Sequence, residues 1–205
     1  MTFLEFKNQM FPLACFNIHQ IYAWQADFDR NNLTRWIKAG YIVRLRQGYF
    51  AFPEYRRKPD YHMYFANRIY RPSYISLHTA LAFYGMIPEA VVQVTSVTTL
   101  KTAYFDNAFA QYSYKTVKES MMFGYDLMPM EGDRVIQFAT PEKAILDLLY
   151  LYPFYDSERE MEELRFDDYF MQEELDKDLL INYCARTKNK ALDKRLKLLF
   201  KAYAL

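Results

Sequence analysis

The stretch DFDRNNLTRWIKAGYIVRLRQGYFAFPE, residues 27–54, decides how the first part of the chain folds, because it joins a helix start to a basic hairpin. Asp29 is a suitable N-cap for a helix that follows it. Just upstream, Asn17 with Gln20 three residues later has the pattern of a capping box, which predicts another helix over about residues 18–25. The sequence therefore predicts two short helices joined by a tight turn.

The second of these helices has two different sides. At about 100° per residue, Leu33, Trp36 and Ile37 fall together, which is the spacing of a face that packs against a core. The opposite side carries residue types that hydrogen-bond to base edges and phosphates, with Arg30 at the border. These residues are Asn31, Thr34, Arg35 and Lys38. A helix face exposed to solvent has the same composition, so the helix alone leaves both interpretations open.

A two-residue turn at Gln47 and Gly48 is predicted to form the hairpin that follows. The predicted strand pairs are Arg46 with Tyr49, Leu45 with Phe50, Arg44 with Ala51, and Val43 with Phe52. One face of the hairpin is then wholly apolar, and the other carries both arginines. A slip of one residue would mix the two faces, so the register is internally consistent.

A helix pair at a tight turn followed by a basic two-stranded ribbon is the order of a winged helix-turn-helix domain, which binds double-stranded DNA. The residues expected to contact bases are Asn31, Thr34 and Arg35. The residues expected to contact phosphates are Lys38, Arg44 and Arg46. Arg30 and Gln47 complete the predicted DNA-binding set. The alternative is a winged helix that serves as a protein-interaction module.

Charge divides the chain near residue 58. Residues 1–58 hold nine Lys or Arg against four Asp or Glu, a net charge of +5, and residues 59–205 hold seventeen against twenty-one, a net charge of −4; the sum is the +1 of the whole chain. Such asymmetry favours a polyanion-binding module joined to a second part. We therefore expect a winged helix-turn-helix domain over residues 1–58 and an α+β domain over residues 59–205.

Composition predicts a folded cytoplasmic protein. With 52% hydrophobic and 19% aromatic residues, the chain has ample material for a packed core. No apolar run approaches the roughly 18 residues of a membrane-spanning helix, and the first residues, MTFLEFKNQM, lack the pattern of a secretion signal. Cys15 and Cys184 lie far apart, so neither a disulfide framework nor a zinc cluster is indicated.

The second part of the chain mixes helix and strand signals. Helices are predicted over about residues 61–70, after Ser76 as N-cap with Gly85 as terminator, and after Thr140 as N-cap with Pro141 at the first position. Strands are predicted over residues 91–99, 109–117 and 134–139. We therefore expect an α+β fold in which the winged helix is followed by a mixed helix and small antiparallel sheet domain with a helical C-terminus.

The predicted helical tail separates its charges. Residues 156–178 carry eleven acids against three bases, whereas residues 186–201 carry seven bases against one acid. Two antiparallel helices would neutralise each other in this arrangement. A solvated acidic face is the simplest interpretation of the first segment, and a surface for a basic partner is the alternative.

The chain lacks the sequence patterns of enzymes and metal sites. It has no Gly-rich phosphate loop, no zinc-ligand spacing and no nucleophile elbow. Ser76 and His78 are two residues apart on a predicted helix, so their side chains diverge. Glu142 and Asp147 are five residues apart on a predicted helix, so their carboxylates do not converge on one site either. Helix capping and exposure to solvent explain these two acidic residues better than acid–base catalysis does. We expect a protein that is not an enzyme and that uses neither metal nor cofactor.

Five segments follow one another in an order that is typical of one protein family. They are IKAGYIVRLRQGYFAF, YISLHTALAFYGMIPE, VTSVTT, FGY at 123–125 and ATPEKAILDLL at 139–149. In this order the chain resembles the AbiEi-type antitoxins of type IV toxin–antitoxin systems. The likeness covers roughly residues 15–152, and the tail, residues 156–205, matches no pattern of that family.

The resemblance implies an abortive-infection antitoxin that represses its own operon and counters a nucleotidyltransferase-like toxin encoded beside it, without a need for a stable complex. It implies that the helix and hairpin residues named above contact the operator, as a monomer or a homodimer. The C-terminal motif residues look structural by their chemistry: Ser76, Gly85, Pro88, Thr140, Pro141 and Glu142. The alternatives are a protein-interaction module of a mobile element, and an enzyme acting on nucleic acid or on the toxin.

Overall fold

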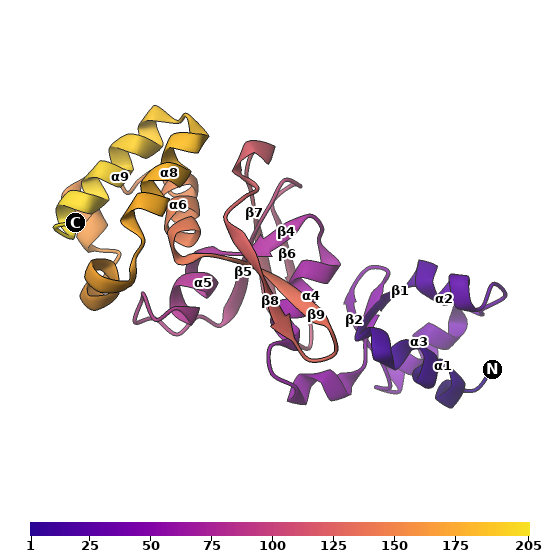
Figure 1. Cartoon of the computed structure of the whole chain (residues 1–205). Helices are drawn as coiled ribbons and strands as arrows, with labels where there is room; N and C mark the ends of the chain where they lie inside the picture. The colour runs from indigo at the N-terminus through magenta and orange to yellow at the C-terminus, as the bar shows by residue number, and fades with distance from the viewer.

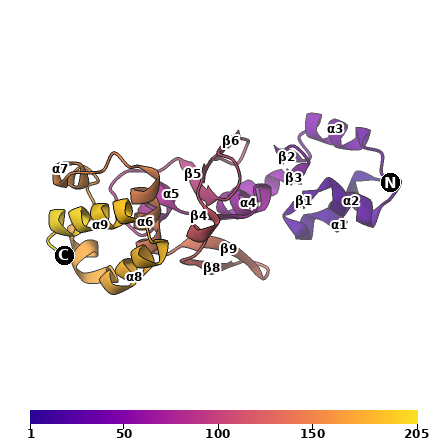
Figure 2. The same cartoon turned by 90° about the horizontal axis from the view of Figure 1, so that it is seen from above.

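The computed structural model describes all 205 residues, and the chain forms an elongated α+β molecule (Figures 1 and 2). A three-stranded antiparallel sheet with its helices lies at the N-terminal end, a six-stranded mixed sheet in the middle, and a group of helices at the C-terminal end. The two termini lie at opposite ends of the molecule in both views. No helix combines the length and the apolar character needed to span a membrane.

The elements from α1 to β3 form what we call the N-terminal unit. Its helices are α1 (Phe3–Met10), α2 (Ile18–Trp24) and α3 (Asn31–Lys38), with a short 3-10 turn at Phe11–Leu13. Its strands are β1 (Cys15–Asn17), β2 (Val43–Arg46) and β3 (Tyr49–Ala51), in the spatial order β1-β3-β2. Aromatic rings fill its core. The centroid of the Phe6 ring lies 4.5 to 6.3 Å from those of Phe16, Phe28, Trp36 and Phe52.

The predicted helix pair is present, with a small shift at the second start. The Asn17 side chain accepts hydrogen bonds from the backbone N–H of Gln20, and the Gln20 side chain accepts from that of Asn17, so the predicted capping box is confirmed. Asp29 accepts a hydrogen bond from the backbone N–H of Asn31 at 2.9 Å. The N-cap of α3 is nevertheless Arg30, one residue later than predicted.

The hairpin turns where the sequence predicts it. Arg46 lies opposite Tyr49, so Gln47 and Gly48 are the two turn residues. Gly48 has a φ of +81°, a conformation that glycine adopts without steric strain.

The predicted register further along the hairpin is wrong. A β-bulge between Arg44 and Arg46 adds one residue to β2, so Arg44 rather than Leu45 pairs with Phe50. The bulge also breaks the alternation of the strand, because Arg44 is exposed and Arg46 is half-buried. Ala51, predicted to lie on the outer face with the arginines, is fully buried.

The middle of the chain forms a mixed sheet in the order β6-β7-β5-β4-β9-β8. The pairs β5 with β7 and β4 with β9 are parallel, and the remaining pairs are antiparallel. The expectation of a small antiparallel sheet is therefore wrong, whereas the α+β class is confirmed. The strands are β4 (Ser73–Ile75), β5 (Gln93–Thr98), β6 (Ala103–Asp106), β7 (Gln111–Thr116), β8 (Tyr125–Met130) and β9 (Arg134–Ala139).

Six helices accompany this sheet and form the C-terminal end. They are α4 (Tyr61–Ile69), α5 (Leu77–Phe83), α6 (Pro141–Leu151), α7 (Glu158–Glu162), α8 (Lys177–Thr187) and α9 (Lys190–Ala202). Short turns of other helix types lie at Pro53–Arg57, Glu119–Met121 and Phe170–Glu174. The predicted start of α6 is confirmed, since the Thr140 side chain accepts from the backbone N–H of Lys143 and Pro141 is the first helical residue.

The acidic and basic segments of the tail contact each other, as expected. Lys194 forms an ion pair with Asp156 at 3.1 Å, and Lys201 forms one with Glu158. All four side chains are largely exposed, so each pair contributes only about 0 to 1 kcal/mol to the free energy of unfolding. Burial of the apolar side of α9 therefore holds this helix in place, and the ion pairs add little.

A buried ion pair lies between the sheet and the C-terminal helices. The Lys143 ammonium lies 2.5 Å from the carboxylate of Asp147, one turn later on α6, and both side chains are 0% exposed. Tyr74 and Ser76 each donate a hydrogen bond to the same carboxylate at 2.8 Å. The expectation that Glu142 and Asp147 face solvent is therefore wrong, as Glu142 is 5% exposed and accepts from the backbone N–H of Asp176. Ser76 is the N-cap residue of α5, as predicted, but its hydroxyl donates to Asp147 and makes no capping hydrogen bond.

Burial governs the titration of this pair. Desolvation raises the pKa of Asp147, although Lys143 and the two hydroxyl groups act against it. Desolvation likewise lowers the pKa of Lys143, and the nearby carboxylate opposes that change. Each charge is therefore tolerated only because the other is present.

We predict that Lys143→Met lowers the free energy of unfolding by about 3 to 5 kcal/mol, because it leaves a buried carboxylate without its cation. The double variant Lys143→Met/Asp147→Leu should lose less, since no buried charge remains. Denaturant unfolding measures both. The matched control is Lys197→Met, which breaks an exposed pair with Asp193 at the same helical spacing and should change stability very little. Equal losses in Lys143→Met and Lys197→Met would contradict the assignment.

Candidate nucleic-acid interface

A hollow of about 320 Å³ lies where the start of α3 faces the tip of the β2–β3 hairpin. Ile18, Leu33 and Phe50 supply its apolar lining. Its polar lining comes from Arg30, Asn31, Thr34, Arg44, Gln47 and Gly48. Five of the eight predicted DNA-binding residues thus lie around one depression, although they come from two segments of the chain.

Packing of α3 determines which of its side chains reach this hollow. Leu33 is 6% exposed and Trp36 is 8% exposed, because they contribute to the aromatic core of the N-terminal unit. Asn31 and Thr34 lie on the other side of the helix and are exposed, as predicted. The sequence periodicity is sufficient to predict this exposure, because the residues opposite the buried side of a short helix face solvent.

The hairpin tip is held beside the helix pair by a backbone contact. The N–H of Ile18, the first residue of α2, donates to the carbonyl of Gly48 at 3.2 Å. The turn therefore cannot swing away from the helices without losing this hydrogen bond. The contact explains why Gln47 and Arg44 lie close to residues of α3.

The hollow carries positive charge that the protein does not neutralise. Arg30 and Arg44 line it, and neither takes part in an ion pair. Asp29, the acidic residue next to Arg30 in the chain, accepts a hydrogen bond from the backbone N–H of Asn31. Two guanidinium groups around an open depression form a surface that suits phosphate groups.

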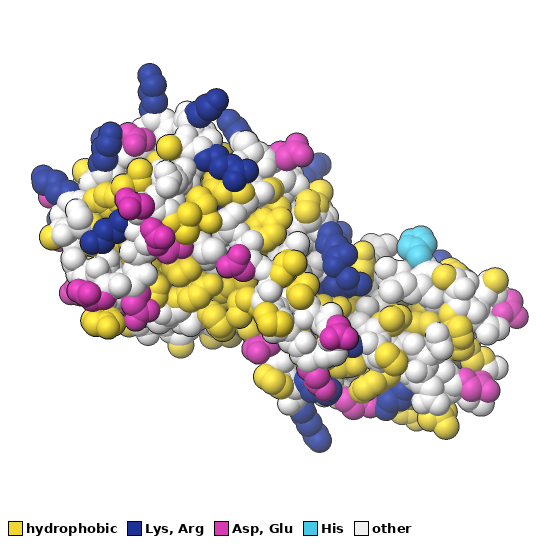
Figure 3. All heavy atoms as spheres, in the orientation of Figure 1, with side chains coloured by type: hydrophobic (Ala, Val, Ile, Leu, Met, Phe, Trp, Pro, Cys, Tyr) yellow, Lys and Arg dark blue, Asp and Glu magenta, His cyan; other side chains and the backbone are white.

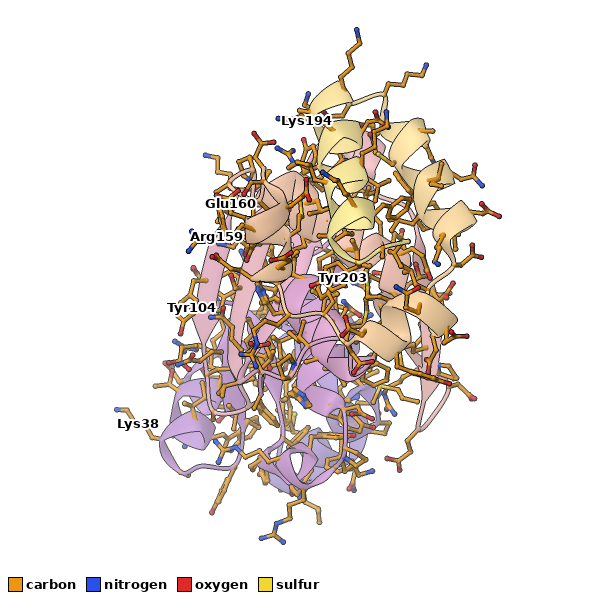
Figure 4. The ribbon with its side chains drawn as sticks, turned by 90° about the vertical axis from the view of Figure 1, so that its left-hand side faces the viewer. Lys38, Tyr104, Arg159, Glu160, Lys194 and Tyr203 are labelled. Atoms are coloured by element: carbon orange, nitrogen blue, oxygen red, sulfur yellow. The ribbon has the colours of Figure 1, made fainter.

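Arg35 and Lys38 lie on α3 beyond the hollow. Both are exposed, and the guanidinium of Arg35 donates to the side-chain oxygen of Asn32. Figure 4 shows the side chain of Lys38 projecting away from the ribbon into solvent. These two residues extend the basic surface along the helix, as the sequence predicts.

Arg46 does not join this surface, although the sequence predicts it to be a phosphate anchor. Its guanidinium lies 4.8 Å from the ring centroids of both Tyr70 and Phe105, and it donates to the carbonyl of Ile69 at 2.7 Å. These partners belong to α4, its C-terminal end and β6. The physical reason is the bulge in β2, which turns Arg46 away from the side on which Arg44 lies.

Asn107 is a second link at the same junction that sequence reasoning missed. Its side-chain amide donates to the carbonyl of Leu45, the residue in the bulge, at 2.9 Å. The hairpin is thus attached to the six-stranded sheet through both Arg46 and Asn107. No local sequence pattern predicts these contacts, because the hydrogen-bond partners are 23 to 62 residues apart in the chain.

Ser76 and His78, the other candidates for chemistry in the sequence, lie apart from each other. Ser76 faces Asp147, whereas His78 lines a separate hollow with Leu81 and Tyr155, so these two side chains diverge as expected. Nowhere do three His, Cys, Asp or Glu side chains converge to hold a metal ion. No protein-family model matches this chain, and none of the curated proteins does.

We predict that Arg46→Ala lowers the free energy of unfolding by about 1 to 3 kcal/mol, since it removes two cation–π contacts and a half-buried hydrogen bond. Arg46→Lys should recover less than half of this loss, because an ammonium cannot stack against two rings as a planar guanidinium does. Denaturant unfolding is the measurement. The control Arg44→Ala, at an exposed position of the same strand, should change stability by less than about 0.5 kcal/mol. A similar loss in Arg44→Ala and Arg46→Ala would contradict the assignment.

Proposed function

We propose that the chain is a sequence-specific DNA-binding repressor whose N-terminal unit is a winged helix-turn-helix domain. The observation that carries the proposal is the hollow in which the exposed side of α3 and the hairpin tip present unpaired arginines together. In this reading α2 and α3 are the helix-turn-helix and the β2–β3 hairpin is the wing. The short strand β1 supports this assignment, because β1 pairs with β3 and so attaches the wing to the helices.

Each surface residue has a role in this proposal. Asn31, Thr34 and Arg35 enter the major groove on α3 and contact base edges, since asparagine suits adenine and arginine suits guanine. The phosphate contacts are assigned to Arg30, Lys38, Arg44 and Gln47. Arg46 is omitted from the contact set and holds the wing in position instead.

We further propose that the chain acts as the antitoxin of a type IV toxin–antitoxin pair, as its resemblance to AbiEi-type antitoxins implies. Three of the segments that carry the resemblance meet around the buried ion pair. Tyr74 and Ser76 come from YISLHTALAFYGMIPE, Phe123 and Gly124 from FGY, and Lys143 and Asp147 from ATPEKAILDLL. The spacing of these segments therefore follows from one packed cluster, which supports their joint occurrence as a fold signature.

The proposal predicts preferential binding to the DNA upstream of the chain's own gene. Arg35→Ala should reduce the preference for that DNA over a scrambled duplex by about 1 to 3 kcal/mol, because it removes a base contact. Arg44→Ala should weaken binding to both duplexes similarly and reduce the log–log salt slope by about one unit, because it removes a phosphate contact. Fluorescence anisotropy over a range of salt concentrations measures both quantities.

Arg46→Lys is the matched control in this experiment. This variant keeps the positive charge on β2. It should leave the salt slope of DNA binding unchanged, even where the affinity for DNA changes. A wild-type protein that binds its own upstream DNA no better than scrambled duplex would eliminate the repressor proposal and favour the protein-interaction alternative.

The antitoxin proposal predicts a toxin gene beside this one. Expression of that neighbouring gene alone should arrest growth, and co-expression of the full chain from an unrelated promoter should restore it. Arg44→Ala should still restore growth, because the antitoxic role is assigned to residues 59–205 rather than to DNA binding. Growth curves are the measurement, and failure of the wild-type chain to restore growth would overturn this part of the proposal.

A further inference from the structure

A second hollow, of about 370 Å³, lies at the other end of the molecule from the predicted DNA surface. It opens between the connection after β7 and the turn that joins α8 to α9. Three lysines from these two segments line it: Lys118, Lys188 and Lys190. Ser120 adds a hydroxyl group and Tyr150 adds an aromatic wall.

Lys188 and Lys190, together with Lys118 from the connection after β7, differ from the other lysines of the basic tail segment. Lys194, Lys197 and Lys201 each form an ion pair with an acidic side chain of the protein. Lys118, Lys188 and Lys190 form no ion pair and donate no side-chain hydrogen bond within the chain. Glu119 follows Lys118 in sequence but does not line the hollow. The three lysines around this depression are therefore not neutralised by the protein.

Lysine ammonium groups around a shared hollow repel each other, and a compact anion of high charge removes that repulsion. Figure 3 shows Lys and Arg side chains gathered around the end of the C-terminal helices where α8 and α9 meet. The start of α9 adds a small positive potential, but Asn189 already accepts the N–H groups of Ala191 and Leu192. The lysines are therefore the main source of attraction for an anion.

We propose that this hollow binds a small molecule carrying a phosphate chain. Lys118, Lys188 and Lys190 hold the phosphates, and Tyr150 contacts the organic part of the ligand. The volume of about 370 Å³ is at the lower end of the range for small-molecule sites and suits a ligand of mononucleotide size. This site is separate from the predicted DNA surface, so it stands whether or not the N-terminal unit binds DNA.

Isothermal titration calorimetry of the full chain at low salt tests the proposal, with tripolyphosphate and ATP as separate probes. Both should bind saturably at this hollow, and any binding at the surface beside α3 is distinguished because variants of Lys188 and Lys190 leave it unchanged. Tighter binding of ATP that is lost in Tyr150→Leu identifies a nucleotide-like ligand, and equal affinities identify the phosphate chain alone as the recognised group. Absence of saturable binding by both probes would overturn the proposal.

Two variants remove charge from the hollow without harming the fold. Lys188 has a φ of +52°, so Lys188→Gly removes an ammonium group at a position that favours glycine. Lys190 is the first residue of α9, so Lys190→Glu places an acid at a helix start, where it is stabilising. Each variant should weaken binding of both probes about tenfold or more while keeping or raising the melting temperature.

Lys194→Ala is the matched control, because it removes a lysine of the same helix that is paired with Asp156 and does not line the hollow. It should change the affinity for tripolyphosphate less than about twofold. An equal loss of affinity in Lys194→Ala and Lys188→Gly, which each remove one positive charge, would show diffuse electrostatic attraction and would overturn the proposed site.

Discussion

A carboxylate without access to water constrains how the larger part of this chain is arranged. Asp147 is satisfied by Lys143 on its own helix, by Tyr74 of β4 and by Ser76 at the start of α5. If any of these elements shifted, a charge or a polar group would stay buried without a partner, at a free-energy loss of several kcal/mol. The ion pair therefore favours one arrangement of sheet and helices over others that would bury the same apolar surface.

The surroundings of this pair explain features of the sequence that have no local cause. Gly124 has a φ of +70°, and a side chain there would approach the methylene groups of Lys143 to 3.1 Å and the ring of Tyr183 to 2.9 Å. The ring of Phe123 lies 4.7 Å from the Lys143 ammonium. Glu142 extends the network to α8, as its carboxylate accepts the N–H of Asp176. The short FGY segment is thus a packing requirement of the buried lysine.

Local patterns were enough to predict much of the N-terminal unit. The cap at Asn17, the hydrogen bond from the Asn31 N–H to Asp29, the polar side of α3 and the turn at Gln47 all depend on residues within a few positions of each other. The bulge in β2 was missed because its cause is tertiary: Arg46 binds groups of α4 and β6, and Asn107 binds the carbonyl in the bulge. A simple alternation of side chains cannot anticipate that an arginine gains more from two aromatic rings than from solvent.

The difference between local patterns and tertiary contacts also explains which elements of the rest of the chain the sequence predicts and which it does not. β5, β7 and β9 are rich in β-branched and aromatic residues and were predicted, whereas β4 has only three residues and β8 contains a proline. The parallel pairing of β5 with β7 joins strands through a crossover and leaves no sign in either strand alone. Asp147 is expected from the sequence to be exposed, because acidic residues are rarely buried. Its partner Tyr74 lies 73 residues away in the chain, so no local pattern indicates that it is buried.

The attachment of the hairpin to the central sheet has a consequence for any function of the N-terminal unit. Arg44 and Gln47, which face the hollow beside α3, lie on the same hairpin as Arg46 and the bulge that Asn107 binds. The position of the hairpin tip relative to α3 is therefore set in part by α4 and β6. A ligand or partner that moved these central elements would alter the geometry of the basic surface without contacting it.

A net charge of +1 hides two separate basic surfaces. One surrounds the hollow beside α3, and the other surrounds the hollow at the turn between α8 and α9, near the opposite end of an elongated molecule. At about 0.1 M salt, exposed charges separated by more than about 10 Å are largely screened from each other. An anion bound at one surface therefore leaves the potential of the other almost unchanged. The two proposed ligands would therefore bind without direct electrostatic coupling, and any coupling between the surfaces would depend on packed contacts such as those of Arg46 and Asp147.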